Sequence, residues 1–408
     1  MIVIDVIVFV KNCGENIMEN RIHLNGKTTF AKIMIGEIDK TTRDQIQTFI
    51  DHPAFRKSKV RIMPDCHAGK SAVIGTTATF KDAIIPNMVG VDIGCGVISM
   101  NIGSQDDIDF QALDDHIRKY VPIGYVHHHN VKAQMQWLPG IMPERVQRVE
   151  NFMKDIHAQL NSDKHYNLSI GTLGGGNHFI EFGRDEDENV WITIHSGSRG
   201  FGYNVATWHQ NRAKAMMKEM YHGDTYRDLE FLTKSTGMND YLEDVKIAQS
   251  FARVSREAMM YKILAFFDKE AICTTEVVES VHNYIDDNMI RKGAISAKVG
   301  EKVIIPFNME DGLIIGVGLG NNDWNCSAPH GAGRVDSRRW AKANLSFSDA
   351  ENRMKEKGIW TSSLSLKTLD ETRDAYKSKD LIINAIKDTV EILKWVKPIY
   401  NLKYEDKD

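Results

Sequence analysis

Asp92 and Cys95 stand three positions apart in the stretch PNMVGVDIGCGV, residues 86–97, which is otherwise apolar and rich in glycine. Burying an ionised carboxylate costs on the order of several kcal/mol unless a positive charge compensates for it. A thiol is a suitable neighbour for that carboxylate when both groups bind the same cation, which deprotonates the thiol. The pair therefore predicts half of a metal site.

Four further segments have a related composition, because each places a histidine near glycines. They are MPDCHAGK (63–70), LGGGNHFIE (173–181), IHSGSRGFG (194–202) and SAPHGAGR (327–334). A single histidine of this kind is most often a hydrogen-bonded structural residue, but four such segments together with Asp92 and Cys95 favour a shared site. The glycines allow main-chain N–H groups to point at an anion and let the backbone approach a ligand. A ligand set with only one thiolate is typical of an open catalytic site, and ligand softness alone favours zinc.

Strands and helices must bring these segments together. Runs rich in β-branched residues predict strands at 71–80, 190–198 and 312–320, each next to glycines. Helical periodicity predicts helices at 141–160, 204–221, 244–268 and 379–396. The opening MIVIDVIVFV is apolar, but it carries Asp5, lacks a basic leader and is too short to span a bilayer, so it fits neither a signal peptide nor a membrane helix. We expect a first strand there.

The composition is that of an ordinary globular protein. Of 408 residues, 42% are hydrophobic and 26% are charged, and the net charge of −4 excludes a uniformly basic coat for nucleic acid, so a polyanion would need a local patch. The five cysteines form no CxxC pair, which argues against a disulfide framework and favours the cytoplasm. No linker is visible, so we expect one α+β domain over 1–408, with residues 1–20 as a peripheral strand or extension.

The segments containing these residues resemble, in this order, the signature motifs of the RtcB-type RNA-splicing ligases, the GTP-dependent 3'-phosphate RNA ligases. The resemblance extends from about Lys57 to Arg339 and rests on MPDCHAGK, VGVDIGCG, LGGGNHFIE, HSGSRG and SAPHGAGR. It implies a single large mixed-sheet domain with surrounding helices and a central dinuclear metal pocket. It also implies an enzyme that joins RNA 3'-phosphate or 2',3'-cyclic phosphate ends to 5'-hydroxyl ends, in RNA repair or tRNA splicing.

The resemblance assigns the metal ligands. In that family the cysteine of DIGCG bridges two manganese ions, and this role would fall to Cys95. Asp92 and His178 would join it on one ion, while His195 and His282 would join it on the other. By itself, the VHNY stretch around His282 is more typical of a histidine on a helix.

His330 corresponds to the nucleophile of the family, which attacks the α-phosphate of GTP to form a histidine–GMP intermediate. Imidazole suits this role because it is largely neutral at about pH 7 and forms a labile P–N bond. Two divalent ions would neutralise the triphosphate. The guanylate then passes to the RNA 3'-phosphate, giving RNA-3'-pp-5'-G, and a 5'-hydroxyl displaces GMP.

The resemblance also assigns binding residues. Those placed around GTP or GMP are Asn177, His178, Phe179, Ile180, Glu181, His282, Asn283, Pro306, Phe307, Asn308, Met309, His330, Gly331, Ala332, Gly333 and Lys403. Glu181 is suited to accept hydrogen bonds from N1 and N2 of guanine, which would favour GTP over ATP. The basic residues assigned to RNA and its terminal phosphates are Arg199, Arg334 and Arg338.

Some positions depart from the family pattern. Residues 306–309 read PFNM where the family commonly has Pro-Met-Gly-Thr, and Leu313 replaces a small polar residue. Lys403 is followed by YEDKD instead of ending the chain as Lys-Gly, and Ser255 replaces an asparagine beside Arg256. These differences predict a divergent subgroup with a specialised RNA target.

Two other classes of protein remain open on the sequence. Asp/Cys/His clusters also activate water, so a dinuclear metal-dependent phosphodiesterase or nuclease is one alternative. A non-catalytic RNA-binding protein is another, although every metal and nucleophile position of the family is occupied here. The sequence leaves open which RNA is joined and whether an archease-type activator takes part.

Overall fold

The computed structural model describes residues 21–130, 142–161, 164–221, 226–267 and 276–405. The strand expected at MIVIDVIVFV lies outside these residues. The helices are α1 (Lys40–Ile50), α2 (Phe110–Tyr120), α4 (Met142–Phe152), α5 (Arg199–Tyr221), α6 (Met238–Leu264), α7 (Arg338–Asn344), α8 (Phe347–Glu356) and α9 (Lys379–Ile386). Several of them begin after a short polar residue whose side chain accepts a hydrogen bond from a first-turn N–H group, as at Asp39, Asp109, Ser337, Ser346 and Ser378.

Two large sheets carry most of the strands in the described residues. The six-stranded sheet has the order β1 (Ile22–Asn25), β2 (Phe30–Ile33), β3 (Val60–His67), β4 (Ile74–Thr79), β12 (Met289–Lys292) and β11 (Asn283–Asp286). The eight-stranded sheet has the order β10 (Glu276–Val281), β6 (Gly96–Ser104), β8 (Asn189–Ser196), β7 (Phe179–Arg184), β18 (Val390–Lys403), β15 (Gly312–Gly318) and β14 (Lys302–Asn308), with β17 (Trp360–Thr361) paired to β18.

Two short ladders complete the described strands. They pair β13 (Ala294–Ser296) with β16 (Ser327–Pro329), and β5 (Ala83–Ile84) with β9 (Leu232–Thr233). The predicted mixed architecture is therefore confirmed. Within it, the strands are divided mainly between a six-stranded and an eight-stranded sheet.

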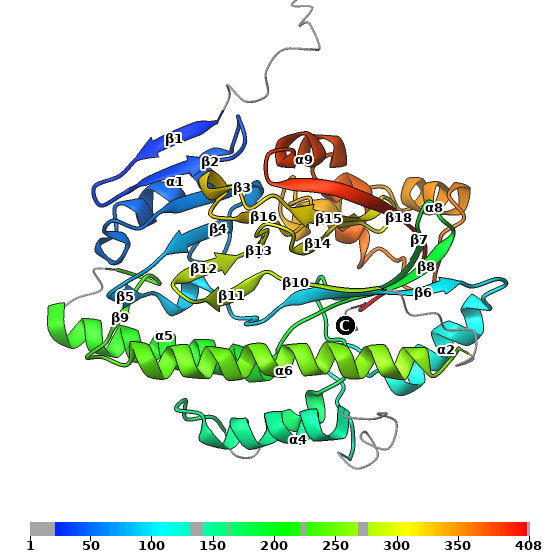
Figure 1. Ribbon diagram of the computed structural model, residues 1–408, viewed down its shortest axis with the longest axis horizontal. Helices are drawn as coiled ribbons and strands as arrows, with labels where there is room; N and C mark the ends of the chain where they lie inside the picture. The colour runs from blue at the N-terminus through cyan, green and yellow to red at the C-terminus, as the bar shows by residue number, and fades with distance from the viewer. Residues whose placement is uncertain (1–20, 131–141, 162–163, 222–225, 268–275, 406–408) are drawn as a thin grey trace, which may run out of the picture.

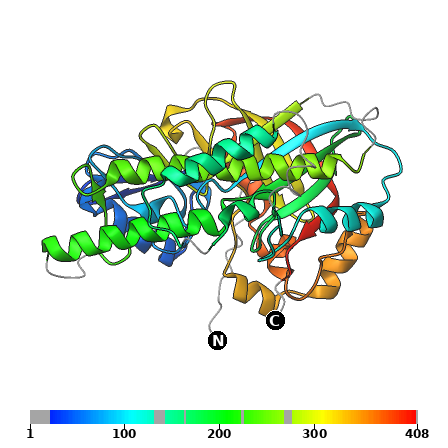
Figure 2. The same ribbon diagram turned by 90° about the horizontal axis from the view of Figure 1, so that it is seen from below.

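The long helices α5 and α6 lie side by side along one side of the sheets, and α4 lies on the far side of α6 (Figures 1 and 2). Helix α6 joins the two main hydrophobic clusters of the molecule. Its first part, including Tyr241 and Phe251, packs with residues of the six-stranded sheet, and its last part, including Met259 and Ile263, packs with residues of the eight-stranded sheet. One helix therefore holds both sheets.

The three strands predicted at 71–80, 190–198 and 312–320 are present as β4, β8 and β15, and the helices predicted at 141–160, 204–221 and 244–268 correspond to α4, α5 and α6. The helix predicted at 379–396 is wrong in its second half. Helix α9 ends at Ile386, and β18 begins at Val390 and pairs with β15 and β7. The run TVEILKWV fits either period, and its β-branched and aromatic residues are stabilised by sheet pairing.

Candidate functional site

Four adjacent antiparallel strands of the eight-stranded sheet place four of the five predicted metal ligands at the same end of the sheet. Cys95 directly precedes β6, His178 directly precedes β7, and His282 directly follows β10. His195 lies near the end of β8, where it is opposite Val97 on one neighbour and Phe179 on the other. Since neighbouring strands run in opposite directions, these chain positions meet at the same end of the sheet. His282 thus lies between two strands, and not on a helix.

The predicted ligands form two sets that share Cys95. In one set His178 Nε2 lies 2.9 Å from Asp92 Oδ2 and 3.5 Å from Cys95 Sγ. In the other set His195 Nε2 lies 3.2 Å from Cys95 Sγ and 3.3 Å from His282 Nε2. The structure therefore brings all five residues together in the grouping that the resemblance implied.

The hydrogen bonds behind these side chains favour metal cations between them. His178 Nδ1 lies 3.0 Å from Leu173 O, and His195 Nδ1 lies 3.1 Å from Asn177 O. A carbonyl oxygen only accepts, so each ring carries its proton on Nδ1 and turns the Nε2 lone pair toward the cluster, the arrangement of metal-bound histidines. The lone pair of His178 then faces a carboxylate oxygen, an unfavourable contact that a cation relieves. The donor set fits two divalent ions.

Burial acts on the same groups. It lowers the pKa of His195 and His282 and so keeps both rings neutral, the form that binds metals. Burial, together with the charge of Asp92, raises the pKa of the Cys95 thiol well above its usual range. The thiolate therefore needs a nearby cation to form.

The start of α5 stabilises the Asp92 carboxylate. Ser198 N donates a hydrogen bond of 3.0 Å to Asp92 Oδ1, and a side chain at Gly197 would overlap this carboxylate. Burial opposes ionisation of Asp92, but the hydrogen bond from the Cys95 thiol and the nearby charge of Arg199 act against burial, and the pKa of Asp92 is lowered. The positive end of the helix dipole acts in the same direction.

Arg256 of α6 joins two of the ligand-bearing loops from behind. Its Nη1 donates to Gly94 O at 2.7 Å and to Ser196 O at 2.8 Å, and its Nη2 pairs with Glu279 at 2.9 Å. The neighbouring Ser255, which departs from the family pattern, accepts a hydrogen bond from Gly171 N at 2.9 Å. The serine thus supports the glycine-rich segment that leads to His178.

His330 lies next to the second ligand set. Its ring centroid is 4.8 Å from that of His282. Its Nδ1 lies 2.6 Å from Oδ2 of the fully buried Asp65, although the contact is poorly aligned for a hydrogen bond. Gly333, with φ of +73°, allows its chain to pass against the backbone of Asp65, where a side chain would overlap. Asp65 was not predicted as a site residue, although it lies within the singled-out motif MPDCHAGK.

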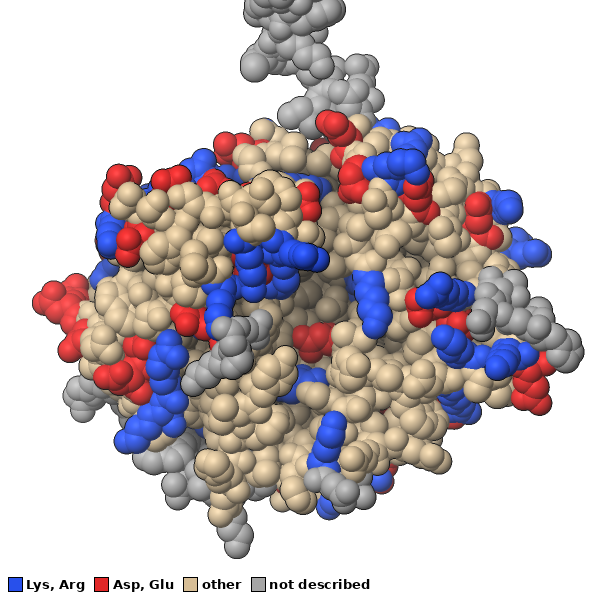
Figure 3. Space-filling view, turned by 180° about the vertical axis from the view of Figure 1, so that it is seen from behind, with Lys and Arg blue, Asp and Glu red and all other residues tan. Residues whose placement is uncertain are grey.

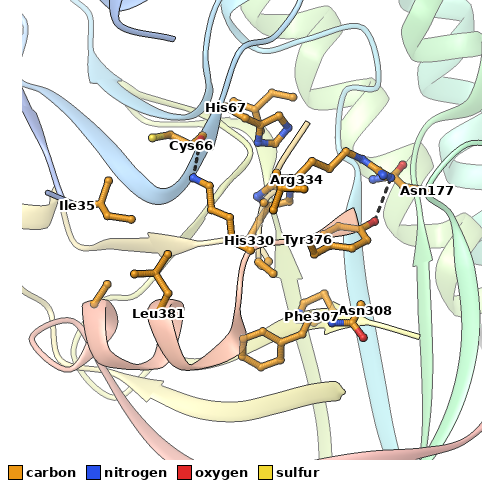
Figure 4. Close-up of a pocket in the computed structure, with 18 of the residues that line it drawn as sticks. Ile35, Cys66, His67, Asn177, Phe307, Asn308, His330, Arg334, Tyr376 and Leu381 are labelled. Carbon is orange, nitrogen blue, oxygen red and sulfur yellow. Dashed lines mark hydrogen bonds between the residues drawn. The ribbon is translucent and has the colours of Figure 1, made fainter. Parts of the chain in front are cut away.

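A cavity of about 2130 Å³ opens beside His330 (Figure 4). Of the residues predicted around GTP, those lining it are Asn177, Phe179, Glu181, His282, Pro306, Phe307, Asn308, Met309, His330, Gly331, Ala332, Gly333 and Lys403. Its far part lies between residues 34–41 and 66–70 and the helix α9, where Ile35 and Leu381 face the cavity. The structure therefore gathers most of the predicted nucleotide residues around one space.

Four other predicted binding residues lie outside this lining, and one of them is His178, which belongs to the first ligand set. Ile180 is fully buried and packs in the core beneath the sheet. Asn283 links two loops, since its Nδ2 donates to Asp92 O at 3.3 Å and its Oδ1 accepts from Gly293 N at 3.0 Å. Arg199 donates to Thr172 Oγ1 at 3.2 Å and also to Gly124 O, behind the glycine-rich segment.

Two of the residues that depart from the family pattern have structural partners. The Phe307 ring stacks on Trp395 with centroids 5.3 Å apart and planes 3° apart. Asn308 Oδ1 accepts hydrogen bonds from the backbone N–H groups of Glu310 and Asp311, at 2.9 and 3.0 Å. Asn308 thus uses its carbonyl oxygen to close the turn that follows β14.

Glu181 lies at the inner end of the cavity, on β7. Burial raises its pKa to about 8, and the positive charge of Lys403 opposes this shift. Lys403 Nζ lies over the Phe179 ring, 4.8 Å from its centroid, and donates to Glu371 Oε2 at 2.9 Å. Lys403 therefore faces the predicted guanine pocket although the chain continues beyond it.

Glu371 organises the basic residues at the cavity. It accepts from Lys403, Arg334, Arg338 and the Tyr376 hydroxyl, the last at 2.8 Å. Burial opposes its ionisation, but the three cations lower its pKa well below the usual range. Arg334 and Arg338, predicted as phosphate ligands, are thus already paired with a carboxylate. Glu371 escaped prediction because nothing in the segment TLDETRDAY marks a buried acid.

Figure 3 shows a hollow in one face of the molecule, with Lys and Arg side chains around it and acidic side chains within it. The basic residues that line the cavity are Arg21, Lys70, Arg334, Arg338, Lys377, Lys387 and Lys403. Positive charge is thus available locally in a chain whose net charge is −4. None of the helices within the described ranges combines the length and apolar character that a bilayer span requires.

Comparison with known proteins gives a consistent result. The family model described as "tRNA-splicing ligase RtcB" matches residues 45–404. The "RNA-splicing ligase RtcB" of Escherichia coli K12 is 33% identical over 377 residues, which cover 84% of this chain and 90% of that protein. The "tRNA-splicing ligase RtcB" of Nanoarchaeum equitans is 28% identical over 398 residues, covering 79% of this chain and 83% of that protein. The chain belongs to the RtcB family.

Proposed function

We propose that this protein is an RNA ligase that uses GTP and two Mn²⁺ ions to join RNA 3'-phosphate or 2',3'-cyclic phosphate ends to 5'-hydroxyl ends. Membership in the RtcB family supports RNA ligation. Two ligand sets that share Cys95 support a dinuclear centre, and the position of His330 beside that centre supports a covalent intermediate. The single observation that carries the proposal is that His330 lines the cavity and lies next to His282 of the second ligand set.

In the first step His330 acts as the nucleophile. The Asp65 carboxylate beside Nδ1 favours the tautomer with its proton on Nδ1 and its lone pair on Nε2. Nε2 attacks the α-phosphorus of GTP, a P–N bond forms, and the bond to pyrophosphate breaks. Bound divalent ions supply charge neutralisation of the triphosphate. Glu181, once ionised, accepts from N1–H and N2–H of guanine, which an adenine cannot offer.

In the second step an oxygen of the RNA 3'-phosphate attacks the guanylate phosphorus, and His330 leaves as a neutral ring. The 5'-hydroxyl of the second RNA end then attacks the 3'-phosphorus, GMP departs, and the strand is closed. A 2',3'-cyclic phosphate is first hydrolysed to the 3'-phosphate. Arg199, Arg334 and Arg338 are the cations we assign to the RNA phosphates, with the last two exchanging part of their pairing to Glu371 for phosphate.

The test separates ligation from hydrolysis. Wild-type protein incubated with α-labelled GTP and Mn²⁺ should acquire an acid-labile label and should join RNA ends bearing 3'-phosphate and 5'-hydroxyl groups. His330→Ala should lose both activities and keep its metal content, because His330 belongs to neither ligand set. Cleavage of RNA without any protein label would support the phosphodiesterase alternative, and joining by His330→Ala would refute the assigned nucleophile.

The cellular setting is part of the proposal. Cys66, Cys95 and Cys326 are free thiols among the described residues, and oxidation of Cys95 would remove the shared metal ligand. A reducing compartment such as the cytoplasm suits this chemistry. We propose RNA repair or tRNA splicing as the process, with an archease-type activator as a candidate partner. Adding such an activator to the joining assay tests whether it increases turnover.

A further inference from the structure

Two tyrosines form an exposed aromatic pair next to the candidate site. The Tyr125 side chain is 83% exposed, which is unusual for so large a ring. Its ring lies edge-to-face against that of Tyr404, with centroids 6.0 Å apart and planes 88° apart. Tyr404 belongs to the short segment that continues beyond Lys403. The two rings come from opposite parts of the chain and form a single surface.

The pair packs against the glycine-rich segment that carries the proposed metal ligand His178. Side chains at Gly124 or Gly175 would meet the Tyr404 ring, so both positions require glycine for this packing. Gly124 N donates to Gly174 O at 2.9 Å, which joins the Tyr125 loop to the same segment. A side chain at Gly174 would overlap the Arg199 guanidinium and would lie 2.6 Å from His178 Nδ1. The rings therefore lie close to the metal ligands.

Residues that neighbour the pair and its glycine-rich support line the cavity, although the two rings themselves do not. Lys403, which precedes Tyr404, lines the cavity, and so does Asn177, two residues after Gly175 and labelled in Figure 4. Arg199 donates to Gly124 O, so its cation is held directly beneath the Tyr125 loop. An exposed ring surface, an arginine and a metal-ligand cluster thus follow one another over a short distance.

This combination fits the end of an RNA strand. Aromatic side chains bind unpaired bases by stacking, which tolerates any base because every base has a π-face. A 3'-phosphate end offers a terminal dianion for an arginine and for metal ions, whereas a 5'-hydroxyl end offers none. The surface of two rings is too small for a stable protein partner but matches a single base.

We propose that Tyr125 and Tyr404 form a stacking platform for the terminal base of the RNA strand that carries the 3'-phosphate, next to the phosphate held at Arg199. The inference rests on the proposed function and adds a subsite to it. The platform acts by positioning, so its loss weakens RNA binding and leaves the reaction of His330 with GTP intact. Base identity has little effect on its contribution.

Photocross-linking of the full-length protein tests the contact directly. The probe is a short oligoribonucleotide with a 3'-phosphate and 5-iodouridine as its 3'-terminal nucleotide, and the matched probe carries 5-iodouridine at its 5'-hydroxyl end. Mass spectrometry should locate the cross-link of the first probe on Tyr125 or Tyr404. A cross-link that avoids both residues would overturn the proposal, as would one given equally or more strongly by the second probe.

Binding measurements with variants give the second readout. Tyr125→Ala and Tyr404→Ala should each bind the 3'-phosphate oligoribonucleotide roughly 5- to 100-fold more weakly, the range expected for one stacked base. Tyr125→Phe should stay within about threefold of wild type because the ring remains. Phe152→Ala is the matched control, since Phe152 is a half-exposed ring on α4, on the far side of α6. Unchanged binding by Tyr125→Ala would refute the platform.

A labelling control separates this inference from the proposed function. Tyr125→Ala should form the GMP adduct at the wild-type rate, because this step needs no RNA. If the wild-type protein itself forms no adduct, the proposed function fails, while the cross-link still decides whether the platform exists. If Tyr125→Ala loses adduct formation while its fold, followed by circular dichroism, is unchanged, the tyrosine acts on GTP and the RNA assignment is wrong.

Discussion

Cys95 is the residue on which both ligand sets depend. Its Sγ is near His178 Nε2 on one side and His195 Nε2 on the other, so removing it breaks both sets at once. We expect Cys95→Ala to lose most of the bound Mn²⁺, as measured by elemental analysis after loading and gel filtration. Cys326→Ala, a free thiol outside both sets, should retain it. Unchanged metal content in Cys95→Ala would contradict a shared ligand.

Glu181 predicts a pH dependence of GTP binding. Burial raises its pKa to about 8 from the usual 4.5, so the carboxyl is mostly protonated at neutral pH. Guanine N1–H and N2–H need the ionised form, and GTP affinity should therefore rise as the pH increases toward and through about 8. Each pH unit below that value should weaken binding by about tenfold. Calorimetric titration of GTP between pH 6 and about 9 measures this.

The contribution of Glu181 to folding stability depends on pH in the opposite direction: it decreases as the pH rises, whereas GTP affinity increases. Because the pKa of Glu181 is raised in the folded state, its favourable contribution to folding stability is complete below about pH 4.5 and is lost as the pH rises to about 8.

Glu181→Gln should remove the pH dependence of GTP binding and reduce the preference for GTP over ATP. A variant that keeps the wild-type pH profile would show that another group titrates.

The family resemblance, which rests on glycine-rich motifs, predicted which residues would lie together, and the structure brings the five predicted ligands and His330 close to one another. All of them lie in glycine-rich contexts apart from His282. Asp65 and Glu371 were missed for a physical reason. Each is a single acid whose importance comes from what it meets, His330 for Asp65 and Arg334, Arg338 and Lys403 for Glu371. Contacts between residues far apart in the chain leave no pattern in the sequence.

At the level of elements, the sheet order decides where the site is. The order β10-β6-β8-β7 places strands from three distant parts of the chain side by side, and only this order brings His282, Cys95, His195 and His178 together. Periodicity predicts single strands but not their neighbours. The same limit explains the error at 379–396, where pairing with β15 and β7 makes a strand of residues whose spacing also fits a helix.

Two neighbouring arginines of helix α6 should differ in how much they contribute to the free energy of unfolding. Arg256 is fully buried and joins Gly94 O, Ser196 O and Glu279, so Arg256→Met removes the donor to two buried carbonyls and leaves Glu279 paired with Arg253 alone. We expect a loss of about 3 to 5 kcal/mol in the free energy of unfolding, measured by urea denaturation. Arg253→Met is the control on the same helix, because the Arg253 side chain is 60% exposed and its pairs with Glu257 and Glu279, at 3.4 and 3.3 Å, should contribute less than about 1 kcal/mol. Equal losses would contradict a positioning role for Arg256.

For the whole molecule, the sharing of α6 between the two hydrophobic clusters predicts that both sheets unfold together, as expected of one domain over 1–408. Two buried tryptophans report on different regions, since Trp324 packs near the six-stranded sheet, beside Met34 and Met63, and Trp191 lies within the eight-stranded sheet. With 5-fluorotryptophan incorporated, their fluorine NMR signals should disappear at the same urea concentration. Mn²⁺ should move both transitions upward together, because most of the proposed ligands lie on or directly beside strands of the eight-stranded sheet, which packs against α6. Separate midpoints, or a metal shift confined to Trp191, would mean that each sheet is stable without the other.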